Sequence, residues 1–275
     1  MVAPQISVII PTYNRQELTV RAIKSVLSQT FSDLECIVVD DGSTDQTAEK
    51  LAKEFGESIQ LIRQANKGVS RARNRGIAIA QGRYLAFLDS DDEWLPRKLE
   101  KQIAFMAAHP EFRICQTTEI WFRKGKRVNL PEMYKKKGGR IFDRSLACCM
   151  ITPSSVLLEQ SLLHEMGNFD ETMLVCEDYD LWLRVTSRHP VGLIEEDLLI
   201  RYGGAPDQLS GQHSQDRFRI RALQKWLNVN EKGRPDWRLA FKALEEKCRI
   251  YGSGCLKRGK EEEGERILAI PGEMR

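Results

Sequence analysis

Short apolar runs rich in β-branched residues alternate with helix-like segments along the first ninety residues of this 275-residue chain. The runs occupy residues 6–10, 34–39, 59–62 and 84–88, and segments with apolar residues on one helical face lie between them, at 16–28, 45–55 and 68–80. This alternation predicts an α/β fold with a mostly parallel sheet flanked by helices. In such folds, ligands bind where the carboxyl ends of the strands meet. We therefore expect functional residues directly after the first, second and fourth runs.

The pattern is less regular after residue 96. We expect helices at 97–108 and 178–187 and strands at 113–122, 154–158 and 196–202. A stretch rich in Gly, Pro and Ser, 203–214, leads into helices at about 216–228, 237–256 and 261–270. These features predict a principal domain over residues 1–214. They also predict a C-terminal helical extension over 215–275, which packs on that domain or forms a homodimer.

Composition indicates the cellular compartment of the protein and its relation to membranes. The seven cysteines are odd in number and include no Cys-x-x-Cys pair, which favours a reduced, cytoplasmic chain. No apolar run approaches 18 residues, and the first residues lack the basic and apolar regions of a signal peptide. We therefore expect neither a transmembrane helix nor a leader. A net charge of +3 gives no support for a nucleic-acid partner.

Two segments are basic enough to suggest an acidic partner. Residues 121–144 contain nine Lys or Arg against Glu132 and Asp143, a net charge of +7. This segment is either a solvated loop or a contact for an acidic ligand or an anionic lipid surface. The second segment is amphipathic: Arg217, Arg221 and Lys225 lie beside Phe218, Leu223 and Trp226. It is compatible with peripheral contact at the inner face of a membrane.

An acidic cluster, Asp89-Ser90-Asp91-Asp92, directly follows the fourth apolar run. Neighbouring carboxylates repel one another, and a divalent cation relieves that repulsion. Alternate residues of an extended segment point to the same side, so Asp89 and Asp91 can converge on one ion while Ser90 points away. Hard oxygen ligands favour Mg²⁺ or Mn²⁺. The alternative is a helix N-cap before a helix starting near Pro96.

Four further motifs carry polar or aromatic residues at comparable places. They are Pro11-Thr12-Tyr13-Asn14 after the first run, Asp40-Asp41-Gly42-Ser43-Thr44-Asp45 after the second, Asn66-Lys67-Gly68 with Ala72-Arg73-Asn74 at the third helix, and Glu177-Asp178-Tyr179-Asp180 further on. Tyr13 can stack on a nucleotide base, or it is a packed turn residue. Asp41 can accept from the N3–H of uracil, or it forms a turn. Arg73 lies near a helix N-terminus, a natural site for anions, or it makes a structural ion pair.

Together and in this order, the five motifs resemble those of family 2 glycosyltransferases, inverting enzymes of the GT-A fold. The resemblance covers about residues 5–205. It implies a GT-A domain with a nucleotide-binding half, 1–95, and an acceptor-binding half, 96–214. It also implies transfer of a sugar from a nucleotide-diphosphate sugar, in the first place a UDP-sugar, to an acceptor hydroxyl. The expected absence of a transmembrane helix favours addition of a single sugar over a processive synthase. Polysaccharide or glycoconjugate biosynthesis is the expected context.

The resemblance also implies roles for individual residues. The general base is Asp178, and Glu177 binds the acceptor. Apart from the resemblance, Trp94 is a candidate acceptor platform because it directly follows the acidic cluster. Asp91 binds Mn²⁺ or Mg²⁺ together with Asp89. His213, in the Gly/Ser-rich stretch, can reach back to complete that metal site. The residues expected to bind the nucleotide-sugar are Pro11, Tyr13, Asp41, Asn66, Gly68, Arg73, Asp89 and Ser90.

Two other functions are compatible with the sequence. A sugar nucleotidyltransferase could use a similar sheet and metal, but the turn after the first run has no glycine-rich phosphate loop. A non-catalytic nucleotide-sugar binding or interaction protein should have lost carboxylates, yet Asp41, Asp89, Asp91 and Asp178 are all present. The acceptor is left open between a saccharide, a lipid-linked saccharide and a protein.

Overall fold

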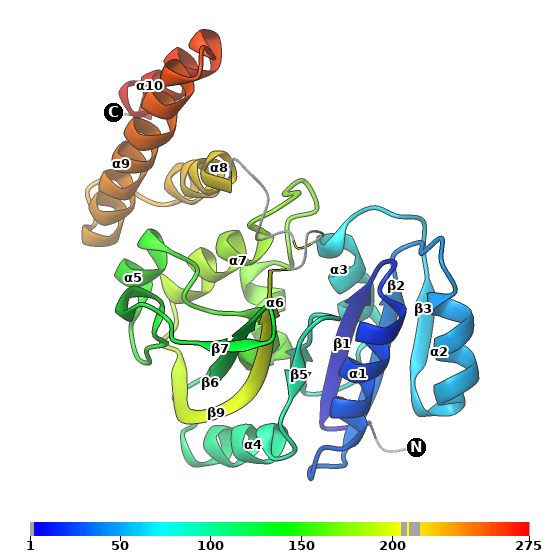
Figure 1. Ribbon diagram of the computed structural model, residues 1–275. Helices are drawn as coiled ribbons and strands as arrows, with labels where there is room; N and C mark the ends of the chain where they lie inside the picture. The colour runs from blue at the N-terminus through cyan, green and yellow to red at the C-terminus, as the bar shows by residue number, and fades with distance from the viewer. Residues whose placement is uncertain (1–2, 205–207, 209–214, 275) are drawn as a thin grey trace.

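The computed structural model describes residues 3–204, 208 and 215–274. Its centre is one curled sheet in the order β3-β2-β1-β4-β8-β6-β9-β5, with β7 added beside β6 (Figure 1). The strands are β1 (Ile6–Thr12), β2 (Leu34–Asp40), β3 (Gln60–Arg63), β4 (Tyr84–Phe87), β5 (Glu93–Trp94), β6 (Ile114–Arg123), β7 (Lys126–Val128), β8 (Val156–Glu159) and β9 (Gly192–Gly203). The helices are α1 (Gln16–Leu27), α2 (Thr47–Phe55), α3 (Val69–Ile79), α4 (Lys98–Ala108), α5 (Phe142–Ala147), α6 (Gln160–Met166), α7 (Glu177–Thr186), α8 (Gln215–Val229), α9 (Pro235–Lys257) and α10 (Glu261–Met274).

The first half of the sheet is parallel, as the sequence predicts. β3, β2, β1 and β4 are neighbours in this order, and all three of their pairings are parallel. β1 is buried on both faces. Ile6, Val8 and Ile10 pack into the cluster that contains α1, whereas Ile9 packs into the cluster that contains α3. Helices therefore cover both faces, and the carboxyl ends of β1, β2 and β4 meet at one edge.

The second half of the sheet is mixed. β8 runs antiparallel to both β4 and β6, so β6 points in the same direction as β4, and β9 runs parallel to β6. The ends of β6 and β9 therefore reach the same edge as those of β1 and β4. The sequence does not reveal β5, α5 and α6, which are too short to show a period. β9 is longer than expected because its polar residues 195–197 interrupt the apolar pattern without interrupting the strand.

The C-terminal helices share a core with the rest of the protein. Leu223 and Trp226 of α8 are buried in a cluster that also contains Tyr179 of α7. Lys225 of the same helix pairs with Asp170 and Asp180. The proposed membrane-facing side of α8 is therefore packed inward, and this helix gives no support for peripheral membrane contact. The predicted boundary at residue 214 lies outside the described residues and stays a prediction.

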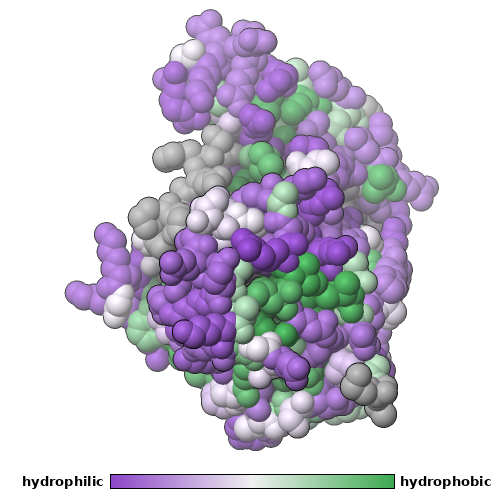
Figure 2. Space-filling view, turned by 90° about the vertical axis from the view of Figure 1, so that its right-hand side faces the viewer, coloured by the Kyte–Doolittle hydropathy of each residue, from purple (hydrophilic) through white to green (hydrophobic). Residues whose placement is uncertain are grey.

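The last two helices form a hairpin that projects from the body (Figure 1). They cross closely at two glycines: a Cβ at Gly252 would lie 2.7 Å from Leu268 Cγ, and one at Gly264 would lie 2.7 Å from Leu256 Cδ2. No helix within the described ranges is long and apolar enough to cross a membrane. The face on the side of α2 and β3 is mostly hydrophilic, with hydrophobic residues gathered near its middle (Figure 2).

Candidate active site

The turns after β1 and β2 are tied to each other by Asn14. Its backbone N–H donates to Ser43 Oγ at 2.9 Å, and its side-chain oxygen accepts from the backbone N–H of Thr44 at 2.8 Å. Asn14 has a φ of 50°, a conformation that Asn tolerates better than most residues. Tyr13, next to it, is 43% exposed at the edge of the sheet. The exposed ring is compatible with stacking on a ligand, which stays a prediction.

Asp41 organises the loop before α3. Its Oδ1 accepts from Gln64 Nε2 at 2.7 Å and from Lys67 N at 3.0 Å, and its Oδ2 accepts from Gly68 N at 2.8 Å. The sequence offered a base contact or a turn residue as alternatives, and the structure shows the loop contact. Oδ1 already accepts two hydrogen bonds, whereas Oδ2 accepts one and has a second lone pair, so a further donor to Oδ2 is compatible with this arrangement. Asp41 thus brings Asn66 and Gly68 to the same edge as Tyr13.

Gly42 is required for this approach of the two loops. Its φ is +79°, and a Cβ built there would lie 2.7 Å from the backbone nitrogen of Asn66. We expect Gly42→Ala to lower the free energy of unfolding by about 1–3 kcal/mol, because the new methyl group meets backbone rather than a flexible side chain. Gly56→Ala is the matched control, since Gly56 has a φ of +49° and no atom within 4 Å of a Cβ.

Urea unfolding midpoints of the two variants check this prediction. The strain of a positive φ acts on both variants, but the steric clash acts on Gly42→Ala alone. Equal midpoints would show that the loops do not depend on the close contact between Gly42 and Asn66.

The acidic cluster after β4 divides into two accessible carboxylates and one buried carboxylate. The side chains of Asp89 and Asp91 are 25% and 15% exposed, whereas Asp92 is almost fully buried. Asp92 accepts from Ser154 Oγ at 2.6 Å and lies 3.5 Å from Arg201 Nε. Burial, together with the charges of Asp89 and Asp91, raises the pKa of Asp92 to about 8. The cluster is not a helix cap, because α4 begins only at Lys98 with Arg97 at its N-cap.

Arg73 connects the β4 turn to the start of α7. Its Nη2 donates to Asp89 Oδ1 at 2.7 Å and its Nη1 donates to Glu177 Oε1 at 2.6 Å. The guanidinium is only 4% exposed, and it stacks on the Phe169 ring with 5.0 Å to the ring centre. Arg73 rather than Arg71 makes this contact, since Arg71 pairs with the exposed Glu171. One side chain therefore joins motifs that are about a hundred residues apart.

Burial and the neighbouring Asp178 raise the pKa of Glu177 to about 7, against the opposing effect of Arg73. Asp178 is partly exposed, and its Oδ1 accepts from the backbone N–H of Tyr179 at 2.7 Å. Both acids lie in the first turn of α7, where the helix dipole stabilises negative charge. The start of α7 therefore presents one buried carboxylate bound to Arg73 and one accessible carboxylate.

Asp89 and Asp91 fit a metal site that is shared with substrate. No group of three or more His, Cys, Asp or Glu among residues 3–204, 208 and 215–274 could hold a metal ion. Mg²⁺, however, is usually bound by one or two carboxylates together with substrate phosphates. Asp91 is a better candidate for a metal ligand than Asp89. Its Oδ2 lies 3.2 Å from Arg15 Nη1 and accepts from Gln208 Nε2 at 2.8 Å, whereas Asp89 is bound to the buried Arg73.

Six of the predicted site residues are buried: Pro11, Asp41, Arg73, Ser90, Trp94 and Glu177. Trp94 is 2% exposed, its indole nitrogen donates to Ser154 O at 2.8 Å, and Lys98 lies over its ring. Trp94 is a core residue, so the structure does not support an acceptor platform there. Pro11 lies within β1 and Ser90 within the acidic cluster, and both are buried. His213 lies outside the described residues.

Several residues of this site were not singled out from the sequence. Arg15 reaches Asp91, Arg21 Nη2 donates to the backbone oxygen of Asp91 at 2.6 Å, and Ser154 Oγ accepts from the backbone N–H of Asp89 at 3.1 Å. The sequence could have indicated Arg15 as a site residue, since it directly follows Tyr13-Asn14 in the turn. Arg21 and Ser154 had none, because only the fold brings them to the acidic cluster.

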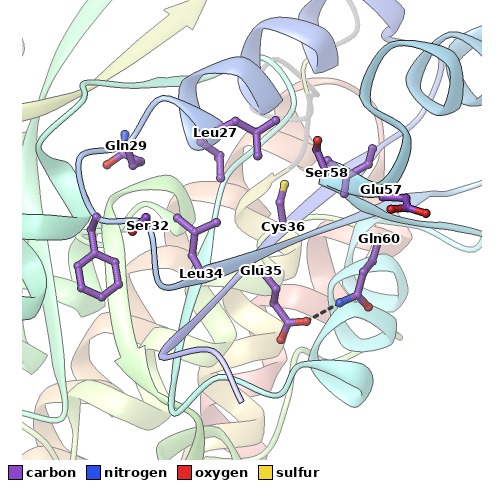
Figure 3. A pocket seen from close by; sticks show the side chains of 12 residues that line it. Leu27, Gln29, Ser32, Leu34, Glu35, Cys36, Glu57, Ser58 and Gln60 are labelled. Carbon is purple, nitrogen blue, oxygen red and sulfur yellow. Dashed lines mark hydrogen bonds between the residues drawn. The ribbon is translucent and has the colours of Figure 1, made fainter. Parts of the chain in front are cut away.

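A separate pocket of about 320 Å³ lies at the opposite edge of the sheet (Figure 3). Leu34 and Gln60 line it, and these residues begin β2 and β3, whereas the motif residues follow the strand ends. Gln60 Nε2 donates to Oε2 of Glu35, which also lines the pocket, at 2.6 Å. This pocket is therefore distinct from the candidate active site.

Comparison with known proteins agrees with this arrangement. Residues 7–166 match the model of glycosyl transferase family 2. The chain belongs to this family. A glucosyltransferase of Escherichia coli, WfaP, is 33% identical over 184 residues, which cover 66% of this chain and 70% of WfaP. A glycosyltransferase of Rickettsia bellii, described as uncharacterized, is 35% identical over 202 residues, which cover 70% of this chain and 28% of that protein.

Solved structures confirm the GT-A fold of this family 2 member. TarS of S. aureus (residues 1–349), in complex with UDP-GlcNAc, superposes with a TM-score of 0.70 at 18% identity, covering 98% of this chain and 80% of TarS. The mannosyltransferase PcManGT from Pyrobaculum calidifontis, in complex with GDP-Man and Mn²⁺, gives 0.62 at 17% identity, covering 99% of this chain and 81% of PcManGT. This chain spans only about a third or less of the Rickettsia bellii, Rickettsia conorii and Rickettsia felis relatives.

Proposed function

We propose that this protein transfers a single sugar from a UDP-sugar to an acceptor hydroxyl, with inversion at the anomeric carbon. The observation that carries the proposal is the Arg73 bridge between Asp89 and Glu177. It brings the donor-side acids and the acceptor-side acids of the family motifs to one edge of the sheet. A protein that only bound nucleotide would not need Asp178 beside this bridge.

The donor site is proposed around Tyr13, Asp41 and Asn66. Tyr13 offers an exposed ring for the base, and Asp41 holds the loop that carries Asn66 and Gly68. TarS binds UDP and UDP-GlcNAc, and WfaP is described as using UDP-Glc, which favours uridine as the base. Asp91 and Asp89 would hold Mn²⁺ or Mg²⁺, which supplies positive charge at the diphosphate.

Asp178 is proposed as the general base. It is the accessible carboxylate at the start of α7, whereas Glu177 is occupied by Arg73. Asp178 would take the proton of the acceptor hydroxyl as that oxygen attacks the anomeric carbon. Arg73 keeps Glu177 and Asp89 in place and adds positive charge at this edge. An attack from the side opposite to the leaving group turns an α-linked donor into a β-linked product.

The acceptor is proposed to be a saccharide linked through diphosphate to a lipid. Two Escherichia coli relatives, WfaP and WfgD, are named for an acceptor of this kind. The basic hairpin of β6 and β7 stands at the same edge as the candidate site. Gly204 packs against this hairpin, since a Cβ built there would lie 3.3 Å from Arg123 Cγ. Gly204 N also donates to Gln208, whose side chain donates to Asp91, so the hairpin is connected to the acidic cluster. A lipid-linked acceptor would bring the protein to a membrane surface.

A transfer assay tests the proposed function. The protein is incubated with Mn²⁺, a synthetic GlcNAc-diphosphate-lipid and UDP-Glc, UDP-GlcNAc or GDP-Man in turn. We expect a β-linked disaccharide from one of the UDP-sugars, identified by proton NMR. Transfer from GDP-Man alone would overturn the choice of uridine, and an α-linked product would overturn inversion.

Asp91→Ala provides a second check on the donor site. We expect this variant to lose the part of UDP affinity that depends on Mn²⁺, because Asp91 is one of the two accessible carboxylates of the acidic cluster. Asp33→Ala is the control, since Asp33 is exposed before β2 at the opposite edge of the sheet. The measurement is UDP affinity with Mn²⁺ and with chelator. An unchanged dependence of UDP affinity on Mn²⁺ in Asp91→Ala would contradict the assignment of Asp91 as a metal ligand.

A further inference from the structure

Cys149 contacts the proposed general base. Its thiol donates to Asp178 Oδ2 at 3.3 Å, although the two residues are 29 positions apart. Oδ1 of the same carboxylate accepts from the backbone N–H of Tyr179 at 2.7 Å. Both oxygens of Asp178 therefore have a donor from the protein, one on each side of the carboxylate.

The same thiol has a second acceptor within reach. Cys149 Sγ lies 3.1 Å from the backbone oxygen of Ile151. A thiol carries a single hydrogen, so it can serve only one of the two acceptors at a time. An ionised carboxylate is the stronger acceptor, because hydrogen bonds to charged groups are stronger than those between neutral groups. A protonated Asp178 would lose this advantage over the carbonyl.

The thiol keeps its hydrogen near neutral pH. Burial and the negative charge of Asp178 raise the pKa of Cys149 well above its usual value of 9.0. Cys149 therefore acts as a hydrogen-bond donor rather than as a thiolate. This distinguishes it from a reactive cysteine, which needs a lowered pKa.

We propose that Cys149 is a positioning residue, whose thiol holds the ionised carboxylate of Asp178 in one orientation and turns to the carbonyl of Ile151 once Asp178 is protonated. This inference rests on the proposed function of Asp178. In the transfer, the acceptor O–H bond breaks and its proton goes to a carboxylate oxygen of Asp178. The electron pair of that bond forms the new bond to the anomeric carbon. The thiol keeps its own hydrogen throughout.

Other charged and titratable groups act on Cys149 and Asp178, so the controls must leave these groups unchanged. They are Lys136, from the segment before α5, Cys176, Glu177 and Tyr179, at the start of α7, and Arg219, from α8. Glu177 titrates near neutral pH and can shape the same pH profile. Variants that differ only at Cys149 keep all these neighbours constant, so their comparison isolates the thiol.

Kinetics of Cys149→Ala and Cys149→Ser form the first test. We expect Cys149→Ala to lower kcat about tenfold with an unchanged donor KM, since a hydrogen bond to a charged group is lost. The acid side of its pH profile should move to higher pH, because a donor to the ionised form is removed. Cys149→Ser keeps a donor and should restore both. The control is Cys148→Ala, whose thiol lies near Met133 O and Met150 Sδ.

Two kinetic results would overturn the inference. One is a Cys149→Ala enzyme with the kcat and pH profile of the unchanged protein. The other is an equal loss in Cys149→Ala and Cys149→Ser without a shift in the profile, which would indicate a packing role only. The supporting result is the shift in Cys149→Ala with rescue by Cys149→Ser.

A second measurement does not depend on transferase activity. The rate of alkylation of Cys149 by iodoacetamide is followed by peptide mass spectrometry between pH 7 and 10. Asp178→Asn removes the negative charge beside the thiol, so we expect Cys149 to react at least threefold faster at a given pH. An unchanged rate would overturn the contact. Retained transfer by Asp178→Asn would instead overturn the proposed base, so the two failures are distinguishable.

Discussion

Asp178→Asn is expected to lower kcat by about 10²–10⁴-fold, the usual contribution of a general base. The amide has the shape of the carboxylate but cannot take a proton from the acceptor. The affinity for UDP should stay within about twofold, because Asp178 makes no contact with Asp41, Asp89 or Asp91 in the structure. Single-turnover transfer and UDP titration measure these two quantities separately.

Asp143→Asn is the matched control for this variant. Asp143 also lies in the first turn of a helix, α5, and is exposed, so its substitution should leave kcat unchanged. Transfer that survives Asp178→Asn would reassign the base to another acid, of which Glu177 is the neighbour. A loss of UDP affinity together with kcat would point to a disturbed fold instead.

Arg73→Ala is expected to destabilise the protein by about 3–5 kcal/mol, the usual effect of removing one partner from a buried ion pair. The substitution leaves Glu177 buried without its cation and Asp89 without its closest partner. Arg71→Ala is the control, because Arg71 is half exposed and its pair with Glu171 should contribute little. Urea unfolding at constant pH measures both variants.

The pH dependence of Arg73→Ala follows from Glu177. The pKa of Glu177 is raised from 4.5 to about 7, so between these values the folded state binds the proton more tightly than the unfolded chain. Its contribution to stability is therefore lost as the pH rises through this range. Without Arg73, Glu177 remains protonated to higher pH, so the variant should lose more stability at pH 8 than at pH 6. An equal loss at both values would argue against Glu177 as the buried acid.

The parallel half of the fold and its edge were predictable from the sequence for a physical reason. Strands that are buried on both faces appear as continuous apolar runs, and their carboxyl ends coincide. Asp89, Asp91 and Tyr13 follow such runs directly, so the sequence places them at the edge. The pairing of Arg73 with Glu177 could be expected only from the family motifs, since the two residues are 104 positions apart.

Two expectations from the sequence differ from the structure for different physical reasons. The position of Trp94 after the acidic cluster suggests an acceptor platform, but β5 is only two residues long and its Trp94 ring is buried in the core. The amphipathic pattern of α8 is real, but its apolar side packs against the protein and not against lipid. Cys149 has no local signal at all, because its contact with Asp178 depends on the packing of the segment after α5 against α7.

Calorimetric titration of the unmodified protein with UDP tests the donor site most directly. UDP, GDP and dTDP are compared, each with Mn²⁺ and with chelator. The proposed donor site predicts binding of UDP in preference to the other two nucleotides, and only in the presence of Mn²⁺. Failure to bind any of the three nucleotides under either condition would contradict the donor site and, with it, the proposed transfer of sugar at this edge of the sheet.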